Sequence, residues 1–400
     1  MINIVIDKPY EFIPPRVNRF WLWVARRMVG RQLLNDFGVS EVECRGQELL
    51  RASLEAGNGV MLVGNHCRPC DPLVMDALAR EVRRPFHTIA SWHVFMESRV
   101  KRFLLPRIGA FSVYREGMDR ESLKSSVKTM VEGRHPLVIF AEGIISRSND
   151  RLLPFMDGPA FMARTAAKQR SDGRVMVHPV FIRYFFEGDL QATVEPVVAE
   201  IESRLSWQPG TNLPLLGRIS RVGMALLALK EIEYLGAAQQ GAVGDRLERL
   251  VDRLLEPLEG EWCGGRHDGD PMARVKRLRT AILPDLVGKE LAEDERARRW
   301  RHLADLYLVQ QLWCYPGDYI AEPTPERVLE TVERFEEDLT DLARAHPPIR
   351  AVVTVGEGVV VEGARERGRA EDPLITEVRR RMEGLMEESK SQRRSAPDGA

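Results

Sequence analysis

The sequence predicts an α/β fold, in which a largely parallel central sheet is flanked by helices and a long, mostly helical insertion or C-terminal region is added. Two observations predict it. Over residues 40–190, short apolar segments of strand length alternate with longer segments of helical periodicity. After about residue 198 this alternation stops, and the chain reads as helix until a strand-like pattern returns near residue 350.

The composition is that of an ordinary globular protein of 400 residues, 44% hydrophobic and 29% charged, with a formal net charge of −1. This balance gives no bulk attraction to nucleic acid, so no nucleic-acid partner is expected. Five scattered cysteines do not make a disulfide framework, which favours a reducing compartment. We find no signal-peptide pattern and no run of the roughly 18 apolar residues that a membrane-spanning helix needs. Any membrane contact is therefore expected to be peripheral, at the cytoplasmic face.

The first predicted element is a helix from Arg16 to Arg31, a segment with five arginines and no acidic residue. On a wheel of about 100° per residue the arginines fall on an arc of roughly 140°, and apolar residues including Trp21 fall on the other side. Such a helix is typical of proteins that lie on a membrane surface. The alternative is a helix that packs on its own domain and keeps its arginines in solvent.

The next elements follow the alternating pattern. GVMLVGN, residues 59–65, predicts a buried strand, and residues 71–82 predict a helix with Asp71 at the N-cap and Pro72 at the first position. A proline in a later strand, Pro179, indicates a kinked or edge strand that lines a pocket. Further strands are predicted at 84–90, 109–115, 135–142 and 175–184, and helices at 120–133 and 158–170.

Four regions are predicted along the chain. Residues 1–198 form the α/β domain with its N-terminal amphipathic helix, and residues 199–347 form the helical insertion or accessory region. At 348–390 a hairpin and a last helix are expected to rejoin the sheet and complete the first domain. Residues 391–400 are expected to be a disordered tail. No internal repeat is recognised.

The segment NHCRPCD, residues 65–71, places polar side chains directly after the buried strand. An imidazole beside a carboxylate can take a proton from a hydroxyl, because the carboxylate orients the ring and stabilises the imidazolium that forms. His66 and Asp71 are therefore candidates for a general base and its partner. The alternatives are a helix-capping role for Asp71 and a loop histidine without special function.

Two further polar clusters follow predicted strands: GAFSVYR ends in Arg115, and FAEGIISR contains Glu142 and Gly143. Ligands of α/β sheets bind outside the carboxyl ends of the strands, so we expect these residues to converge with His66. Arg115 would hold an anionic or polyhydroxyl acceptor, Glu142 would position a hydroxyl, and Gly143 would let the backbone approach closely. The alternative for Arg115 and Glu142 is one structural salt bridge.

Four blocks, NHCRPCD, GAFSVYR, FAEGIISR and VHPVFI (177–182), resemble in order and spacing the blocks of the phospholipid/glycerol acyltransferase family, which includes the lysophosphatidic acid acyltransferases. The resemblance covers about residues 15–190, and the later GEGVVVEG with the helix after it resembles the family's usual domain end. It implies transfer of a fatty acyl group from a thioester to a hydroxyl of a glycerolipid or related lipid, as in phospholipid biosynthesis.

By position, the resemblance makes His66 the general base and Asp71 the residue that orients it. The hydroxyl would attack the thioester directly, so no covalent acyl-enzyme is expected. The acyl donor would be acyl-CoA or acyl carrier protein, and no metal or other cofactor is expected. The substrate-binding residues would be Asn65, Arg115, Glu142, Gly143 and Arg147.

The third block departs from the family pattern Phe-Pro-Glu-Gly-Thr-Arg-Ser, and these departures concern the acceptor. Ile145 stands in place of the arginine and Met156 in place of a later lysine, and the other changes are Ala141 and Ile144. Two cations that would help to bind a phosphate are therefore missing, and Arg147 is the expected substitute. The altered block keeps open a non-catalytic lipid-binding or scaffolding protein on the same fold.

Two weaker patterns remain. Cys67 and Cys70 form a CxxC pair, which is typical of a redox pair or half a zinc site; the alternative is two small residues that fill the loop. ARVKRLR, residues 273–279, is a basic cluster that would meet lipid headgroups or an acidic carrier protein. Its alternative is a solvated helix face.

Overall fold

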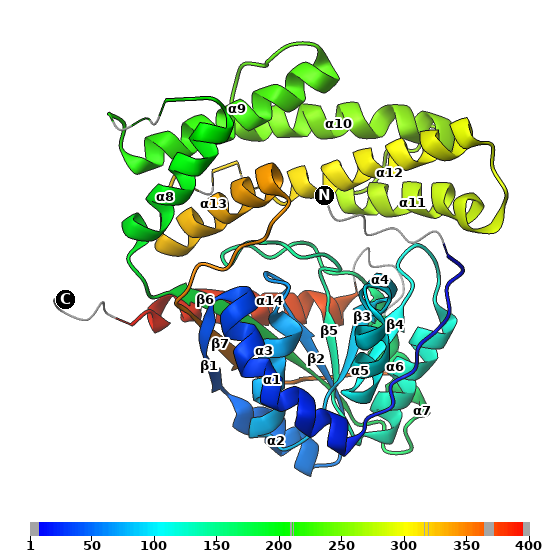
Figure 1. The fold of residues 1–400 in the computed structure, drawn as a ribbon. Coiled ribbons are helices and arrows are strands. Elements are labelled where there is room, and N and C mark those ends of the chain that lie inside the picture. Colours follow the sequence, from blue (N-terminus) through cyan, green and yellow to red (C-terminus); the bar gives the residue numbers. More distant parts are fainter. Residues whose placement is uncertain are drawn as a thin grey trace. The chain divides into compact units, whose positions relative to one another are not determined.

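The computed structural model describes residues 8–208, 210, 212–315, 317, 318, 320–363 and 372–394, and it divides into two compact units (Figure 1). The α/β unit comprises Phe12–Tyr114, Asp119–Gly188 and Ala345–Ala400. The helical unit comprises Met1–Glu11, Arg115–Met118 and Asp189–Arg344. The helical unit therefore begins before residue 199, where the sequence predicted its start.

An eight-stranded sheet forms the centre of the α/β unit, in the order β1-β7-β6-β2-β5-β3-β4 with β8 paired to β6. Neighbouring strands are parallel except at β6, which is antiparallel to β7 and β8. This arrangement confirms the predicted fold class. The strands are β1 (Val39–Arg45), β2 (Gly59–Gly64), β3 (His87–Ser91), β4 (Ala110–Val113), β5 (Leu137–Phe140), β6 (Val175–Phe186), β7 (Ile349–Val355) and β8 (Val359–Val360).

Helices cover both faces of the sheet (Figure 1). Side chains of β2 alternate in direction: Met61 and Val63 belong to a core shared with α6, α7 and α14, and Val60 and Leu62 point the other way, where α2 and α3 pack. All six residues of β2 are buried, as the sequence predicted. The helices of this unit are α1 (Arg19–Phe37), α2 (Gln47–Glu55), α3 (Asp71–Glu81), α4 (Trp92–Met96), α5 (Arg99–Arg107), α6 (Arg120–Glu132), α7 (Gly158–Gln169), α14 (Pro373–Ser389) and η1 (Lys390–Gln392).

The start of α3 differs by one residue from the prediction, and the difference concerns the site. Cys70 is the N-cap and Asp71 is the first helical residue, so Pro72 follows at the second position. The Asp71 side chain is therefore not needed as a cap. α1 also differs from the predicted range, because Asn18 caps its start through hydrogen bonds from the amides of Phe20 and Trp21.

The predicted hairpin at 348–390 is wrong, because β7 and β8 do not pair with each other. Both run antiparallel to β6, and Val355 pairs with Val180 while Val359 pairs with Val177. The break between them lies opposite Pro179, which has no amide hydrogen to donate; its carbonyl accepts from the Gly356 amide. β6 is therefore not an edge strand, and it accommodates the proline where the strand pairing opposite it is interrupted between β7 and β8.

The helical unit is built of α8 (Leu190–Arg204), α9 (Leu215–Leu235), α10 (Val243–Trp262), α11 (Pro271–Gly288), α12 (Glu293–Trp313) and α13 (Pro325–Thr340). A buried glutamate–arginine ion pair is found at each of three successive helix junctions. In each pair the arginine follows the glutamate by 15 or 16 residues. Each guanidinium binds its carboxylate through two nitrogens. The pairs are Glu202–Arg218, Glu231–Arg246 and Glu259–Arg274. This recurrence escaped the sequence analysis, which recognised no repeat.

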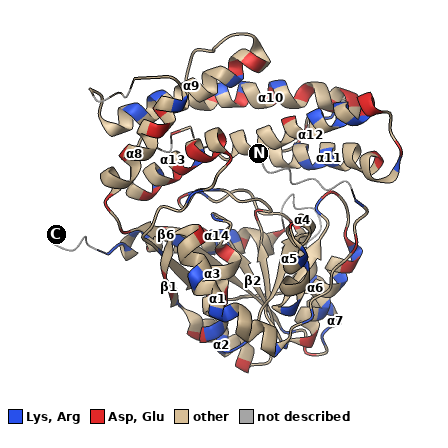
Figure 2. Ribbon diagram, in the orientation of Figure 1, with Lys and Arg blue, Asp and Glu red and all other residues tan. Residues whose placement is uncertain are grey.

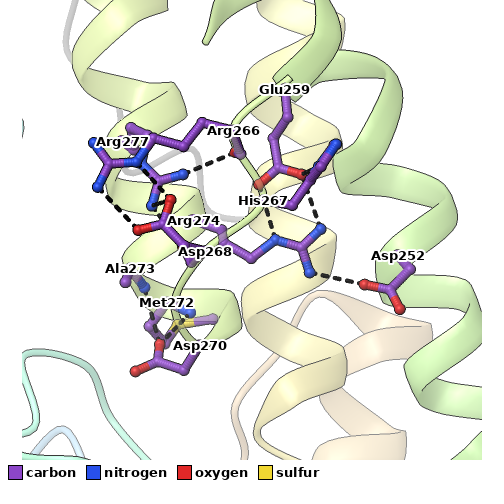
Figure 3. A network of polar contacts seen from close by, with 10 residues as sticks. All are labelled: Asp252, Glu259, Arg266, His267, Asp268, Asp270, Met272, Ala273, Arg274 and Arg277. Atoms are coloured by element: carbon purple, nitrogen blue, oxygen red, sulfur yellow. Dashed lines mark hydrogen bonds and ion pairs between the residues drawn. The ribbon is translucent and has the colours of Figure 1, made fainter. Parts of the chain in front are cut away.

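Figure 3 shows the third pair, which includes a residue of the basic cluster at 273–279. Arg274 binds both oxygens of Glu259 at 2.8 and 2.9 Å and also Asp252 at 2.7 Å. Arg277 donates to the backbone carbonyls of Arg266 and Asp268. Arg274 and Arg279 are buried, so the cluster is largely structural and the alternative of a solvated helix face is wrong for them; its contact with lipid headgroups or an acidic carrier protein stays a prediction.

Two remaining observations concern the ends of the chain and the membrane. Arg394, in the predicted tail, pairs with Glu41 at 2.7 Å, and residues 395–400 lie outside the described residues. Within the described part of the chain, every helix is too short or too polar to cross a bilayer.

Candidate active site

His66 lies at the carboxyl end of β2, and its side chain is held in one orientation. Its Nδ1 lies 2.7 Å from Oδ2 of Asp71, and its ring stacks on Phe140 with centroids 4.4 Å apart and planes 21° apart. Asp71 is completely buried, whereas the His66 side chain keeps 17% of its surface exposed. Nε2 has no hydrogen-bond partner among the described residues. With the proton on Nδ1, the Nε2 lone pair is available as a base.

The Asp71 carboxylate serves this histidine and not the helix that it begins. Oδ2 also accepts from the backbone amide of Arg68 at 3.0 Å, and Oδ1 accepts from the Tyr184 hydroxyl at 2.5 Å. Both oxygens are thus directed back toward the loop and β6. The alternative that Asp71 is a simple helix cap is wrong.

Glu142 holds the backbone of His66. One oxygen accepts from the His66 amide at 2.8 Å and the other from the Leu153 amide at 2.9 Å. The His66 carbonyl in turn accepts from the Ser146 amide at 2.7 Å. Burial raises the pKa of Glu142 to about 8, against the lowering effect of the two amide donors. Both oxygens of Glu142 accept from backbone amides, so the alternative of a structural salt bridge with Arg115 is not what holds this side chain. We assign Glu142 to support His66 rather than to bind substrate.

Asn65, predicted to bind substrate, instead holds two strands together. Its Oδ1 accepts from the Ile182 amide at 2.7 Å and its Nδ2 donates to the Ile182 carbonyl at 3.0 Å. The side chain is 2% exposed. A side-chain amide that bonds with both the N–H and the C=O of a strand residue satisfies the groups that a neighbouring strand would otherwise pair. Asn65 does this for Ile182 just after β2 has ended.

Gly143 is required by backbone conformation. Its φ is +71°, and a Cβ at this position would lie 2.8 Å from Cε of Met156. Met156, which stands where the family has a lysine, thus packs against the turn. Arg147 also has a positive φ, +56°, which is uncommon for a residue with a side chain. Its role as a substrate-binding cation stays a prediction.

Arg115 belongs to the helical unit, in which Arg279 and Glu116 are its charged neighbours. Burial, and after it the Arg279 charge, lowers the pKa of Arg115 to about 10. Its predicted contact with an acceptor stays a prediction.

The cysteines of the CxxC pair are buried beside the catalytic candidates. Burial, and after it the Asp71 charge, raises the pKa of Cys70 to about 12, and its Sγ lies 3.3 Å from the Tyr184 hydroxyl. A thiol that stays protonated is a poor nucleophile and metal ligand. The described residues contain no group of three or more His, Cys, Asp and Glu side chains arranged to hold a metal ion. These observations favour the reading of two small residues that fill the loop.

Sequence reasoning missed Tyr184, Phe140 and Asn149. Tyr184 and Phe140 lie in correctly predicted strands, but their contacts with Asp71 and His66 depend on strand order, which the sequence does not reveal. Asn149 lies in the loop after β5, and its side chain takes both backbone bonds of Tyr184 at 2.9 Å. Asn149 lies two residues after the end of the third block, and no pattern in the sequence marked it.

One known family matches the part of the chain that carries these residues. Residues 41–183 match the family described as acyltransferase, which confirms the resemblance carried by the four blocks. Comparison with curated proteins finds no match. The matched segment includes His66, Asp71 and Glu142. Residues 41–183, about a third of the chain, therefore match the acyltransferase family, and this match supports O-acyl transfer to lipids in general.

Proposed function

We propose that this protein transfers a fatty acyl group from a thioester to a lipid hydroxyl, with His66 as the general base and Asp71 as its partner. The observation that carries the proposal is the His66–Asp71 pair, whose Nε2 is left without a partner among the described residues of an acyltransferase-family domain. Asn65 and Glu142 support this pair from the loops that follow β2 and β5.

The reaction balances in a single displacement. Nε2 takes the proton of the acceptor hydroxyl while its oxygen attacks the thioester carbonyl carbon. The C–S bond then breaks, and the leaving thiolate receives the proton from His66. Asp71 stabilises the imidazolium in between. General-base help of this kind is worth roughly 100- to 10,000-fold in rate, and alignment of the two substrates adds to it.

The donor in this proposal is acyl-CoA or acyl carrier protein, and the acceptor is a glycerolipid such as 1-acylglycerol-3-phosphate, as in phospholipid biosynthesis. Arg147 is the proposed contact to an anionic headgroup, because Ile145 and Met156 occupy the places of the family's cations. A side-by-side assay of phosphorylated and unphosphorylated acceptors tests this choice.

The test of the proposal is acyl transfer from both thioester classes to a panel of lipid hydroxyls. We expect His66→Ala to lower kcat by about 100- to 10,000-fold with little change in stability. His267→Ala, a half-exposed histidine of the helical unit that bonds to Glu259, is the matched control and should keep full activity. Unchanged turnover in His66→Ala would refute the mechanism. Binding of lipid without any turnover would support the non-catalytic alternative.

We also propose peripheral membrane association, at the cytoplasmic face, through a surface made by α1 and α5. On the side of α1 that the wheel made apolar, Ala25 packs inward, as the alternative of a helix that packs on its own domain expects, but Met28 is exposed. Large apolar side chains nevertheless remain exposed on both helices. They are Phe20 (61%), Trp23 (54%), Met28 (62%), Leu34 (45%), Val100 (69%) and Phe103 (42%).

Charge supports a lipid partner for this surface. α5 has four basic residues and no acidic one, and α1 has its only acid near its C-terminal end (Figure 2). The two helices touch through Trp21 and Phe103, whose rings lie edge to face at 5.0 Å. Exposed aromatic residues among cations fit an anionic bilayer, and each basic residue near such a surface contributes about 1 kcal/mol.

Vesicle flotation tests this association. Arg26 is paired with Asp76 at 3.0 Å, so the charge reversal should use the exposed Arg27 and Arg31. We expect Arg27→Glu/Arg31→Glu to lose binding to anionic vesicles at least tenfold, and added salt to weaken the wild type. The equivalent reversal on α6, Lys124→Glu/Lys128→Glu, should leave binding nearly unchanged. Equal losses in both double variants would contradict the α1–α5 surface.

A further inference from the structure

Tyr184, a residue of β6, completes a buried chain of hydrogen bonds behind His66. Its hydroxyl donates to Oδ1 of Asp71 at 2.5 Å, and Oδ2 of the same carboxylate accepts from Nδ1 of His66 at 2.7 Å. Tyr184 is 1% exposed. It therefore lies behind the carboxylate, away from the open Nε2.

Two asparagine side chains hold the part of β6 that carries this tyrosine. Asn149 takes both backbone bonds of Tyr184, each at 2.9 Å, and Asn65 takes both backbone bonds of Ile182. β2 pairs with β6 only as far as Gly64 and Val180, so the asparagines continue the pairing where β2 has ended. The position of the Tyr184 ring is thus determined by the same loops that carry His66 and the altered third block.

The hydroxyl restricts the carboxylate in a way that the histidine alone does not. A carboxylate held at one oxygen can rotate about its Cβ–Cγ bond, whereas donors on both oxygens hold it in one plane. Burial and the Asp71 charge raise the pKa of Tyr184 well above its usual range, so the hydroxyl remains a donor at every working pH. Hydrogen bonds to a buried charged group are stronger than those between neutral groups. Because the Asp71 carboxylate is buried, water does not replace the bond from the Tyr184 hydroxyl.

We propose that Tyr184 is a positioning residue of the acyl-transfer reaction, which fixes the Asp71 carboxylate so that it orients His66. The inference rests on the proposed function, since it assigns a role relative to His66 as base. Tyr184 touches no reacting atom, and its effect passes through Asp71.

A double-mutant cycle tests this coupling. We expect Tyr184→Phe to lower kcat by about 10- to 100-fold, with KM nearly unchanged. This is the usual size of the loss when a hydrogen bond that orients a site residue from behind is removed. In the Asp71→Asn background the same change should cost less than about twofold, because the carboxylate that it acts through is gone. Equal losses in both backgrounds, or no loss in the wild-type background, would overturn the inference.

The pH–rate profile provides a readout that a merely structural tyrosine would not move. Without the Tyr184 hydroxyl, the negative charge of the Asp71 carboxylate is stabilised by one donor fewer. The His66–Asp71 pair should therefore bind its proton more tightly. The acidic limb of kcat/KM should therefore move to higher pH in Tyr184→Phe. Replacement of Tyr184 by 3,5-difluorotyrosine, a stronger donor of the same shape, should move it to lower pH. An unmoved limb in both proteins would overturn the inference, and the second replacement remains informative if Tyr184→Phe does not fold.

Two controls separate this inference from its foundation. Tyr234→Phe removes a comparable tyrosine–aspartate bond, to Asp305 at 3.0 Å in the helical unit, and should leave kcat and the pH profile unchanged. His66→Ala tests the base itself. An inactive His66→Ala beside an unaffected Tyr184→Phe overturns the role of Tyr184 alone, whereas an active His66→Ala overturns the proposed function.

Discussion

At the scale of the residue, the site depends on how one buried carboxylate divides its hydrogen bonds. Asp71 begins a helix, and the sequence therefore allows a capping role. The structure instead directs Oδ2 to His66 and Oδ1 to Tyr184. A carboxylate that is completely buried needs such donors, since an unpaired buried charge costs several kcal/mol.

The sequence could predict those site residues whose contacts are with residues close to them along the chain. His66 and Asp71 are five residues apart, so a sequence pattern can hold both. Glu142 and Asn65 were recognised as important but assigned to the substrate, because a sequence shows that a residue is polar and not where it points. Asn65 in fact binds the backbone of Ile182 in β6, and Glu142 binds the backbone amides of His66 and Leu153, which lie in loops. Tyr184 is 113 residues from Asp71, and only the strand order brings them together.

The backbone of the third block provides a prediction at this scale. Gly143→Ala should destabilise the protein by about 1–2 kcal/mol, because a left-handed backbone disfavours any Cβ, and by more if Met156 cannot move aside. Urea unfolding measures this loss. Met156→Ala in the same background should restore only the part due to the contact with Cε, and a full recovery would show that the positive φ carries no cost.

At the scale of the element, β6 shows why the strands were easier to predict than their neighbours. The apolar run at 175–184 predicts a strand correctly, but Pro179 indicated an edge position, and β6 instead lies between β7 and β2. The proline is tolerated because β7 and β8 form an interrupted partner opposite it. Gly356 and Gly358, which the sequence presented as a hairpin turn, lie in this interruption.

The contact between β3 and α6 predicts a pH dependence of stability. His87, which bonds to Thr129 at 3.0 Å, has a pKa lowered to about 4 by burial and then by the nearby His135. The unfolded chain takes up this proton near pH 6.5 and the folded protein only near pH 4, so stability falls as the pH drops through that window. The loss attributable to His87 is on the order of 2–3 kcal/mol.

Comparison of wild type with His87→Gln measures that contribution. The free energy of unfolding of the variant should depend less on pH between about 6.5 and 4, with His267→Gln, a half-exposed histidine, as the matched control. Parallel pH curves for wild type and His87→Gln would contradict the assignment.

At the scale of the whole molecule, the two units differ in how far their sequence explains them. The family match covers residues 41–183 and lies, apart from Arg115–Met118, in the α/β unit. The helical unit has its own organising feature, the recurring buried glutamate–arginine pair. Two charged residues about 15 positions apart are too sparse a signature to stand out in a chain that is 29% charged, so this repeat could be recognised only from the structure.

The most direct test of the central claim is chemical rescue of the missing base. Acyl transfer by His66→Ala should be lower than that of the wild type by about 100- to 10,000-fold, and added imidazole should restore part of it, with a rate that follows the concentration of the neutral imidazole. A variant that turns over at the wild-type rate without imidazole would contradict the account.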